Sequence, residues 1–422
     1  MTKCVPISSW PVSRAALVAA VFVLGASVGD ALAQPKQETT AVRDRETLRS
    51  VNLLLRHSVI SPKYNPPKLE ASWPMGYRQL TAIGISQTYE TGQELRRKYV
   101  EELGLIAPTY HVKEVYFRAS NADRSLQTAQ MLALGLYPLG TGANPAKYDA
   151  ALKAVPKPDL AFTPVPIHSV SLRNDAVMRP WTGQANCQRY RQFVKALPKS
   201  KLYRAQGKKF SPFLMRIASI TGMQEGKSPA QILYFVNEIY EPLTTIIAHK
   251  KKMTDKISDK DMELLGQLSD WNYHHQFLGK KIGRLTGGPL VGEMLENFNR
   301  FIKDPKTARK LYIYSGHQRT ILGLEAALGI ETARTEGPLF KGRVPPLGSR
   351  YALELHEREP KKYSVRLKFV SGKSEKIIQI PGCSGGFCPI ERFRSVAETV
   401  VPKSYWDWRA QCRVKKAGFF GK

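Results

Sequence analysis

Acidic residues are scarce in this sequence of 422 residues. It has 35 Asp and Glu against 64 Lys and Arg, which gives a formal net charge of +29 and an isoelectric point of about 9.9. This excess fits a partner such as nucleic acid, and it equally fits a solvated basic exterior that attracts small anions. Basic motifs interleaved with aromatic residues are also missing. We therefore expect no dedicated nucleic-acid site.

Long apolar runs are lacking as well. The uncharged stretch 16–26 is followed too soon by Asp30 to form a membrane anchor, which needs about 18 to 20 apolar residues. A basic leader before this stretch and the small residues 31–33 after it are typical of a secretory signal with its cleavage site. We expect 1–33 to be a signal peptide, 34–47 to be a flexible leader, and the mature protein to be secreted or periplasmic.

Cysteine is sparse, and one of the five cysteines, Cys4, lies in the predicted signal peptide. The other four are an even number in an oxidising compartment, which predicts two disulfides. Zinc binding is the alternative, but only the close pair Cys383 and Cys388 approaches ligand spacing, and no histidine pair completes it. The remaining two cysteines are Cys187 and Cys412.

Short apolar runs alternate with helical patterns along most of the chain, which predicts an α/β fold. A helix is expected over 79–99, and another over 122–134 that stops at Gly135. The expected strands are 51–55, 115–117, 311–315, 351–356 and 363–370.

The region 175–305 differs from the rest of the chain. It is rich in Lys, Gln and apolar residues at helical spacing, and it has few alternating runs. We predict a mainly helical cap inserted there, between two parts of an α/β core at 48–174 and 306–422.

Three of the expected strands end in residues suited to binding or attacking phosphate. Arg56 and His57 follow the first strand, Arg118 follows the second, and His317 follows the third. Ligands of open α/β sheets lie beyond the carboxyl ends of the strands, where loops from separate parts of the chain converge. Any one of these residues alone is more often structural, but their recurrence at three strand ends favours a single site.

Phosphoryl transfer explains why these residue types belong together. Arg56 and Arg118 are predicted to bind the charged phosphoryl oxygens through their fork-shaped guanidiniums. Nearby guanidiniums lower the pKa of a histidine, which keeps the imidazole neutral and nucleophilic. We expect His57 to attack phosphorus while His317 donates a hydrogen bond to the same oxygens, and water to hydrolyse the phosphohistidine.

These residues also carry a family resemblance. Leu55–Pro62 resembles the RHGxRxP signature of histidine acid phosphatases, and Ser315–Gln318 is similar to that family's later HD or HAE element. Further similar segments occur in the family's order, so the resemblance covers nearly the whole chain after the signal. They are 73–81, 118–124, 163–168, 285–290 and 345–349.

The resemblance implies a three-layer α/β/α core with an inserted helical cap, acid phosphatase or phytase chemistry, and no metal or other cofactor. It also implies disulfides that join Cys187 to Cys412 and Cys383 to Cys388. The resemblance further implies that position 318 is the place of the acid that protonates the leaving group.

The sequence departs from the family pattern at two positions of the site. Ile60 stands where the family has its second signature arginine, and Gln318 stands where it has an acid. Glutamine has a similar shape but no proton to give. Lys63 or Arg319 can replace the lost positive charge, and Asp123 can supply a proton, if their side chains reach the pocket.

Two functions are compatible with this pattern. The first is hydrolysis of small-molecule phosphomonoesters through a phosphohistidine, at a reduced rate or on a restricted set of substrates. The alternative is an inactive protein that binds phosphate esters. A phosphoryl transferase or mutase fits His57 equally well, but the predicted export signal disfavours it. The sequence indicates neither the substrate nor an oligomeric state.

Overall fold

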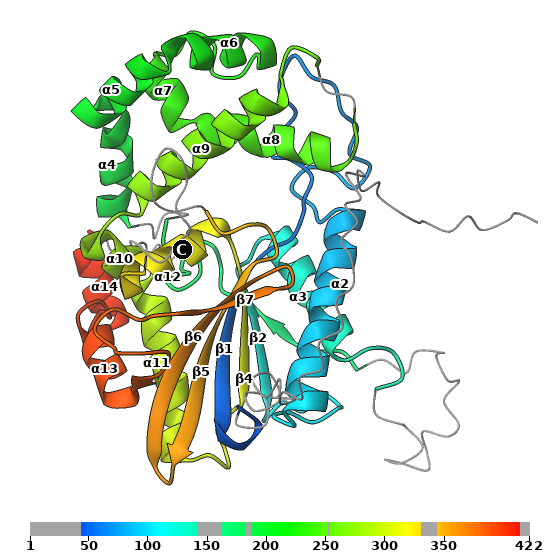
Figure 1. The fold of residues 1–422 in the computed structure, drawn as a ribbon, viewed down its shortest axis with the longest axis vertical. Coiled ribbons are helices and arrows are strands. Elements are labelled where there is room, and N and C mark those ends of the chain that lie inside the picture. The colour runs from blue at the N-terminus through cyan, green and yellow to red at the C-terminus, as the bar shows by residue number, and fades with distance from the viewer. Residues whose placement is uncertain (1–43, 142–162, 182–186, 252–253, 331–343, 414–422) are drawn as a thin grey trace, which may run out of the picture.

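A mixed sheet with helices on both faces forms the core (Figure 1). The computed structural model describes residues 44–141, 163–181, 187–251, 254–330 and 344–413. Within them the sheet has eight strands: β1 (Leu48–Arg56), β2 (Val115–Ala119), β3 (Ile167–His168), β4 (Leu311–Gly316), β5 (Arg350–Glu359), β6 (Lys362–Ser371), β7 (Ser374–Ile378) and β8 (Cys388–Pro389). The strand order is β3-β2-β4-β1-β5-β6-β7, and β8 pairs with β6. The α/β prediction is confirmed.

The sheet combines a parallel and an antiparallel half. β3, β2, β4 and β1 are parallel to one another, whereas β5 pairs antiparallel with β1, and β6, β7 and β8 continue in antiparallel fashion. Parallel strands need crossover connections, which the helices between them supply. The carboxyl ends of β1, β2 and β4 consequently meet at one edge of the sheet.

Both faces of the sheet are buried. Along β1, Leu53 and Leu55 pack on one face, whereas Leu54 packs on the other. The helices of the core are α2 (Ala82–Arg96), which continues into the π-helical turn η1 (Arg97–Glu102), α3 (Asp123–Leu136), α11 (Gly288–Lys303), α12 (Gln318–Leu328), α13 (Ile390–Glu398) and α14 (Tyr405–Gln411). α2 and α3 cover the first face, and α11 and α12 the second. Continuous apolar strands of this kind are typical of sheets covered on both sides.

The helix bounds differ from the predicted ones: the helix expected over 79–99 is α2 followed by η1, and the helix expected over 122–134 is α3. Gly135 does not stop the second helix, because α3 runs on to Leu136. A Cβ atom at Gly135 would lie 2.2 Å from the carbonyl oxygen of Tyr89, and one at Gly92 would lie 2.4 Å from that of Leu132. These glycines therefore let α2 and α3 approach closely, which explains Gly135 better than a helix end does.

A group of helices lies beyond the edge of the sheet where β1, β2 and β4 end (Figure 1). It comprises α4 (Gln188–Ala196), the 3₁₀ turn η4 (Leu197–Lys199), α5 (Lys201–Lys209), α6 (Ser211–Thr221), α7 (Pro229–Tyr234), α8 (Val236–Ala248), α9 (Asp259–Gln276) and α10 (Lys280–Thr286). Most of them share their own apolar core, which includes Tyr203, Leu243 and Leu268. α11 instead packs on the sheet through Met294 and Phe298. Among the described helices, none has both the length and the apolar character needed to cross a bilayer.

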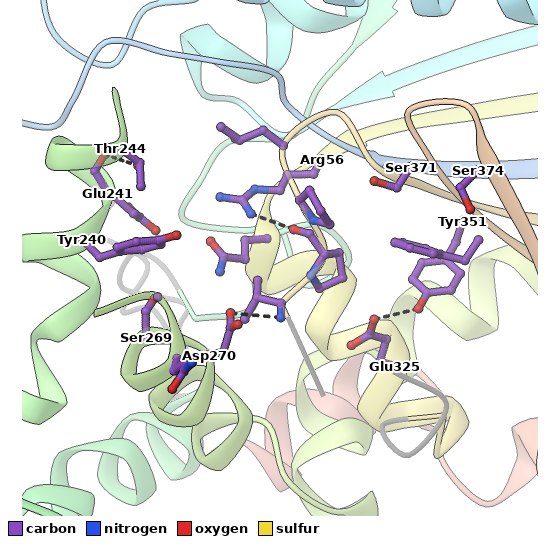
Figure 2. Close-up of a pocket in the computed structure, with 18 of the residues that line it drawn as sticks. Arg56, Tyr240, Glu241, Thr244, Ser269, Asp270, Glu325, Tyr351, Ser371 and Ser374 are labelled. Carbon is purple, nitrogen blue, oxygen red and sulfur yellow. Dashed lines mark hydrogen bonds between the residues drawn. The ribbon is translucent and has the colours of Figure 1, made fainter. Parts of the chain in front are cut away.

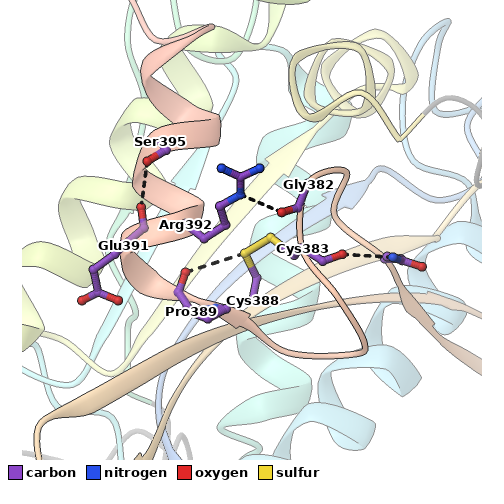
Figure 3. Close-up of a disulfide and its surroundings, with 8 residues drawn as sticks. Gly382, Cys383, Cys388, Pro389, Glu391, Arg392 and Ser395 are labelled. Carbon is purple, nitrogen blue, oxygen red and sulfur yellow. Dashed lines mark hydrogen bonds between the residues drawn. A yellow bond between two sulfur atoms is a disulfide. The ribbon is translucent and has the colours of Figure 1, made fainter.

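Two disulfides join distant and local parts of the chain. Cys187, at the start of α4, is bonded to Cys412, just after α14, which ties the helical region to the C-terminal end of the described core. Cys383 is bonded to Cys388 in the loop before α13 (Figure 3). Arg392 Nε of α13 donates to the carbonyl oxygen of Gly382 in this loop at 2.7 Å. The two disulfides, Cys187–Cys412 and Cys383–Cys388, are the ones that the family resemblance implies.

The expected leader is anchored at its end. Residues 1–33, the predicted signal peptide, lie outside the described residues, as does most of the expected leader 34–47. Asp44 is buried, and its carboxylate contacts Arg366 and Lys368 of β6. The buried cations of β6 therefore hold Asp44, within the last part of the segment expected to be the leader.

Candidate active site

Backbone hydrogen bonds between strand ends bring two histidines together. β1 and β4 pair with Arg56 opposite Gly316, and the N–H of His57 donates to the carbonyl oxygen of Gly316 at 3.2 Å. The imidazole rings of His57 and His317 lie with their centroids 5.6 Å apart. Both side chains are buried, with 7 % and 6 % of their surface exposed. The predicted convergence of these two strand ends is found.

The hydrogen bonds of His57 define its tautomer. Nδ1 lies 3.0 Å from the carbonyl oxygen of Ser58, which only accepts, so Nδ1 carries the proton. Nε2 is then unprotonated, and its lone pair accepts a hydrogen bond from Arg124 Nε at 3.3 Å. Burial, and after it the charges of Arg124 and Arg56, hold the pKa of His57 well below 6.5. His57 is therefore a neutral imidazole with its lone pair facing a cation.

His317 faces the same guanidinium from the other side. Its Nδ1 accepts from Arg124 Nη2 at 3.3 Å, because arginine only donates, and its Nε2 lies 2.6 Å from Ser120 Oγ. Burial and the charges of Arg124 and Arg179 hold the pKa of His317 well below 6.5. Arg124, in the first turn of α3, thus links two neutral imidazoles.

These groups line a cavity of about 510 Å³ between the strand ends and the helical region. Within the described residues, Nε of Arg56 and Nε of Arg179 are buried without a hydrogen-bond partner. Burial and the charges of Arg124 and Arg319 lower the pKa of Arg179 to about 10. Nη1 of Arg56 donates to the carbonyl oxygen of Pro345 at 2.8 Å. Several guanidiniums gathered along one cavity are suited to an anionic ligand. Five arginines line the cavity: Arg56, Arg78, Arg124, Arg179 and Arg319.

Arg118 does not belong to this group. Its guanidinium contacts Asp175 at 3.0 Å and Glu293 at 2.5 Å, and it does not line the cavity. Along β2, Phe117 and Ala119 face α2 and α3, so the alternation of the strand directs Arg118 to the opposite face, where α11 carries Glu293. Two carboxylates neutralise Arg118, and Arg124, six residues further on, occupies the site instead.

The remaining predicted residues divide between the cavity and the surface. Gln318 and Arg319 line the cavity, and the guanidinium of Arg319 lies 5.8 Å from the ring centroid of Tyr273. Lys63 also lines it, but its Nζ lies 3.5 Å from a carboxylate oxygen of Glu238. Asp123 does not line it, and accepts a hydrogen bond from Gln79 at 2.9 Å.

Ile60 places an apolar side chain on the cavity wall. It is half-buried, and its backbone forms an isolated bridge with Leu80. Arg78 lies two residues before Leu80 and lines the same cavity with a backbone φ of 62°. An arginine in this left-handed conformation is strained. Arg78 and Arg179 were not among the predicted site residues, because neither stands at the end of an expected strand.

A second cavity, of about 670 Å³, adjoins the first (Figure 2). The residues shared by the two cavities are Arg56, Glu241, Thr244, Gln318 and Leu347. Figure 2 shows Arg56 and Glu241 pointing toward each other, Arg56 from β1 and Glu241 from α8. Beyond this junction the second cavity carries the carboxyl group of Asp270 and the aromatic rings of Tyr240 and Tyr351.

The fold is similar to that of proteins with solved structures. The chain is similar to a phytase from Klebsiella sp. ASR1, with a TM-score of 0.62 and 17 % identity over 85 % of this chain and 98 % of the other. A Hafnia alvei phytase in complex with myo-inositol hexakis sulphate also gives a TM-score of 0.62, with 16 % identity over the same shares. These likenesses show the fold.

Sequence comparison gives relatives of higher identity. Lysosomal acid phosphatase of Pongo abelii is 29 % identical over 87 % of this chain and 81 % of its own length. Prostatic acid phosphatase of Rattus norvegicus is 28 % identical over 86 % and 89 %. The family model of the histidine phosphatase superfamily (branch 2) matches residues 34–370. The chain therefore belongs to branch 2 of the histidine phosphatase superfamily.

Proposed function

We propose that this protein hydrolyses phosphomonoesters through a phosphohistidine formed at His57. The observation that carries the proposal is the pair of neutral, buried imidazoles linked by Arg124 inside a cavity lined by arginines. Family membership supports phosphatase chemistry, since the relatives named above are acid phosphatases.

The mechanism begins with binding of the phosphate group among Arg56, Arg124 and Arg179. Their guanidiniums neutralise the phosphoryl oxygens and exchange their present contacts for charge-assisted hydrogen bonds. Nε2 of His57 attacks phosphorus, which forms the P–N bond as the ester P–O bond breaks. The negative charge of the bound phosphate favours a proton on His317, and the imidazolium then donates to a phosphoryl oxygen. Water hydrolyses the phosphohistidine and regenerates neutral His57.

Arg78 supplies the guanidinium that Ile60 cannot. It reaches the cavity from the segment paired with Ile60, and its charge contributes to the lowered pKa values of Arg124 and Arg179. A strained backbone at a cavity wall is typical of a functional position, where the surrounding structure maintains an unfavourable conformation. The site thus retains a full set of phosphate-binding cations despite the substitution at position 60.

We also propose that the protein is exported. Two disulfides are consistent with folding in an oxidising compartment. The secretory signal at 1–33 remains a prediction from the sequence.

A catalytically inactive phosphate-binding protein is the second candidate. Gln318 at the position of the family's acid favours it, because a site without a proton donor acts slowly on poor leaving groups. An assay of p-nitrophenyl phosphate hydrolysis between pH 4 and pH 8 distinguishes the two. We expect turnover that His57→Ala abolishes while the variant retains the far-ultraviolet spectrum and unfolding transition of the wild type. Turnover that persists in His57→Ala contradicts the proposed nucleophile.

A further inference from the structure

Alkyl phosphate esters need a proton at the leaving oxygen, and Gln318 has none to give. The phosphate group lies among Arg56, Arg124 and Arg179 in the first cavity if the proposed function holds, and the present inference rests on it. The junction beside Arg56 gives the leaving group room to extend into the second cavity. On this placement, a proton donor for the breaking P–O bond would come from the residues that both cavities share.

Glu241 is the one carboxylic acid among those five shared residues. It comes from α8, and Figure 2 shows it facing Arg56 across the opening. Tyr273 Oη donates to its Oε1 at 3.0 Å, which fixes the direction of the carboxyl group. Its backbone is also held, because the carbonyl oxygen of Glu241 accepts from Thr245 Oγ1 at 3.0 Å within the helix.

The other acids near the site are placed differently. Glu238, one turn earlier in α8, accepts from Tyr64 Oη at 2.7 Å and contacts Lys63, and it lines only the cavity of His57. Asp270 lines only the second cavity, where its Oδ1 accepts from the N–H of Val344 at 3.1 Å. Asp123 lines neither. Among the described acids that line either cavity, Glu241 alone lines both.

We propose that Glu241 is the general acid and base of this site, in place of the acid that the family carries at position 318. As His57 Nε2 forms the P–N bond, the protonated carboxyl group of Glu241 transfers its proton to the leaving alkoxide, and the alcohol departs. The resulting carboxylate then takes a proton from water as the water oxygen attacks phosphorus and the P–N bond breaks. His57 returns to its neutral form, Glu241 regains its proton, and inorganic phosphate is released.

Two substrates with different leaving groups test this role. p-Nitrophenyl phosphate releases a stable anion, whereas glycerol 2-phosphate releases an alkoxide that must be protonated. General-acid help is worth about a hundredfold to ten-thousandfold in rate. Glu241→Gln should lower kcat/KM for glycerol 2-phosphate by about that factor and change kcat/KM for p-nitrophenyl phosphate by less than tenfold.

Glu238→Gln is the matched control, since it makes the same change one helical turn away. The ratio of the two kcat/KM values should stay within a fewfold of the wild type in this variant. In the Glu241→Gln background, Gln318→Asp should restore hydrolysis of glycerol 2-phosphate, because position 318 also lies at the junction.

Failure of this inference is distinct from failure of the proposed function. Equal losses on both substrates in Glu241→Gln, or an unchanged ratio, overturn the role of Glu241 while hydrolysis at His57 stands. A wild-type protein that hydrolyses neither substrate overturns the proposed function itself, and the role of Glu241 with it.

Discussion

The imidazole rings of His57 and His317 meet edge to face, at an interplanar angle of 72° and with centroids 5.6 Å apart. Neither ring donates a hydrogen bond to the other, and each instead accepts one from Arg124. Because one guanidinium serves both rings, a phosphate that draws Arg124 toward itself also frees the lone pair of His57 Nε2. Binding and activation of the nucleophile are therefore coupled through a single side chain.

The pH dependence of aryl ester hydrolysis should report on this coupling. Burial first, and then Arg124 and Arg56, keep the pKa of His57 well below 6.5, so the imidazole stays neutral in mildly acidic solution. On the acidic side, kcat/KM falls as the pH drops through the pKa of His57 in the free enzyme. Arg124→Met removes the largest charge that lowers this pKa, so the acidic limb of the profile should move toward neutral pH. A limb that stays in place while kcat/KM falls at every pH contradicts the contact between Arg124 and His57.

Arg124 and Arg118 should differ in what their loss impairs. Arg124→Gln should weaken inhibition by inorganic phosphate about ten- to a hundredfold, since a hydrogen bond to a charged group is worth about 1.5–3 kcal/mol. Arg118→Gln leaves Asp175 buried without its cation and should destabilise the fold by about 3–5 kcal/mol. Urea unfolding and phosphate inhibition, measured on both variants, check this assignment. An Arg118→Gln protein that unfolds as the wild type does but no longer binds phosphate contradicts this assignment.

The strained conformation of Arg78 allows a test that separates binding from stability. Arg78→Gly places glycine at a φ of 62°, which glycine adopts without strain, so the melting temperature should stay the same or rise. The inhibition constant of inorganic phosphate should rise by about tenfold or more, because one charge-assisted hydrogen bond is lost.

The double variant Arg78→Gly with Ile60→Arg returns the guanidinium to the cavity from position 60. It should recover most of the lost phosphate affinity. If Arg78→Gly instead lowers the melting temperature and leaves the inhibition constant unchanged, the role of Arg78 is structural.

The α/β fold was predictable from the sequence because its central strands, such as β1 and β4, carry runs of apolar residues that are buried on both faces. The run around Leu53 and Leu54 is such a strand, and the histidines after it and after β4 were found to converge. The alternation of side chains along β2 turns Arg118 away from the site. A strand of only five residues does not reveal from its sequence which face of the sheet each side chain occupies. Arg78, Arg179 and Glu241 come from a turn, a loop and the helical region, so only the tertiary structure places them beside His57.

Direct trapping of the phosphorylated protein tests the central claim that His57 is the nucleophile. The wild type and His57→Ala are mixed with ³²P-labelled phosphomonoester, denatured within milliseconds in alkali, in which phosphohistidine survives, and mapped by peptide mass. The account predicts one labelled peptide, with phosphate on His57, and none in the His57→Ala protein. Rapid hydrolysis without a labelled peptide, or label on another residue, would contradict it.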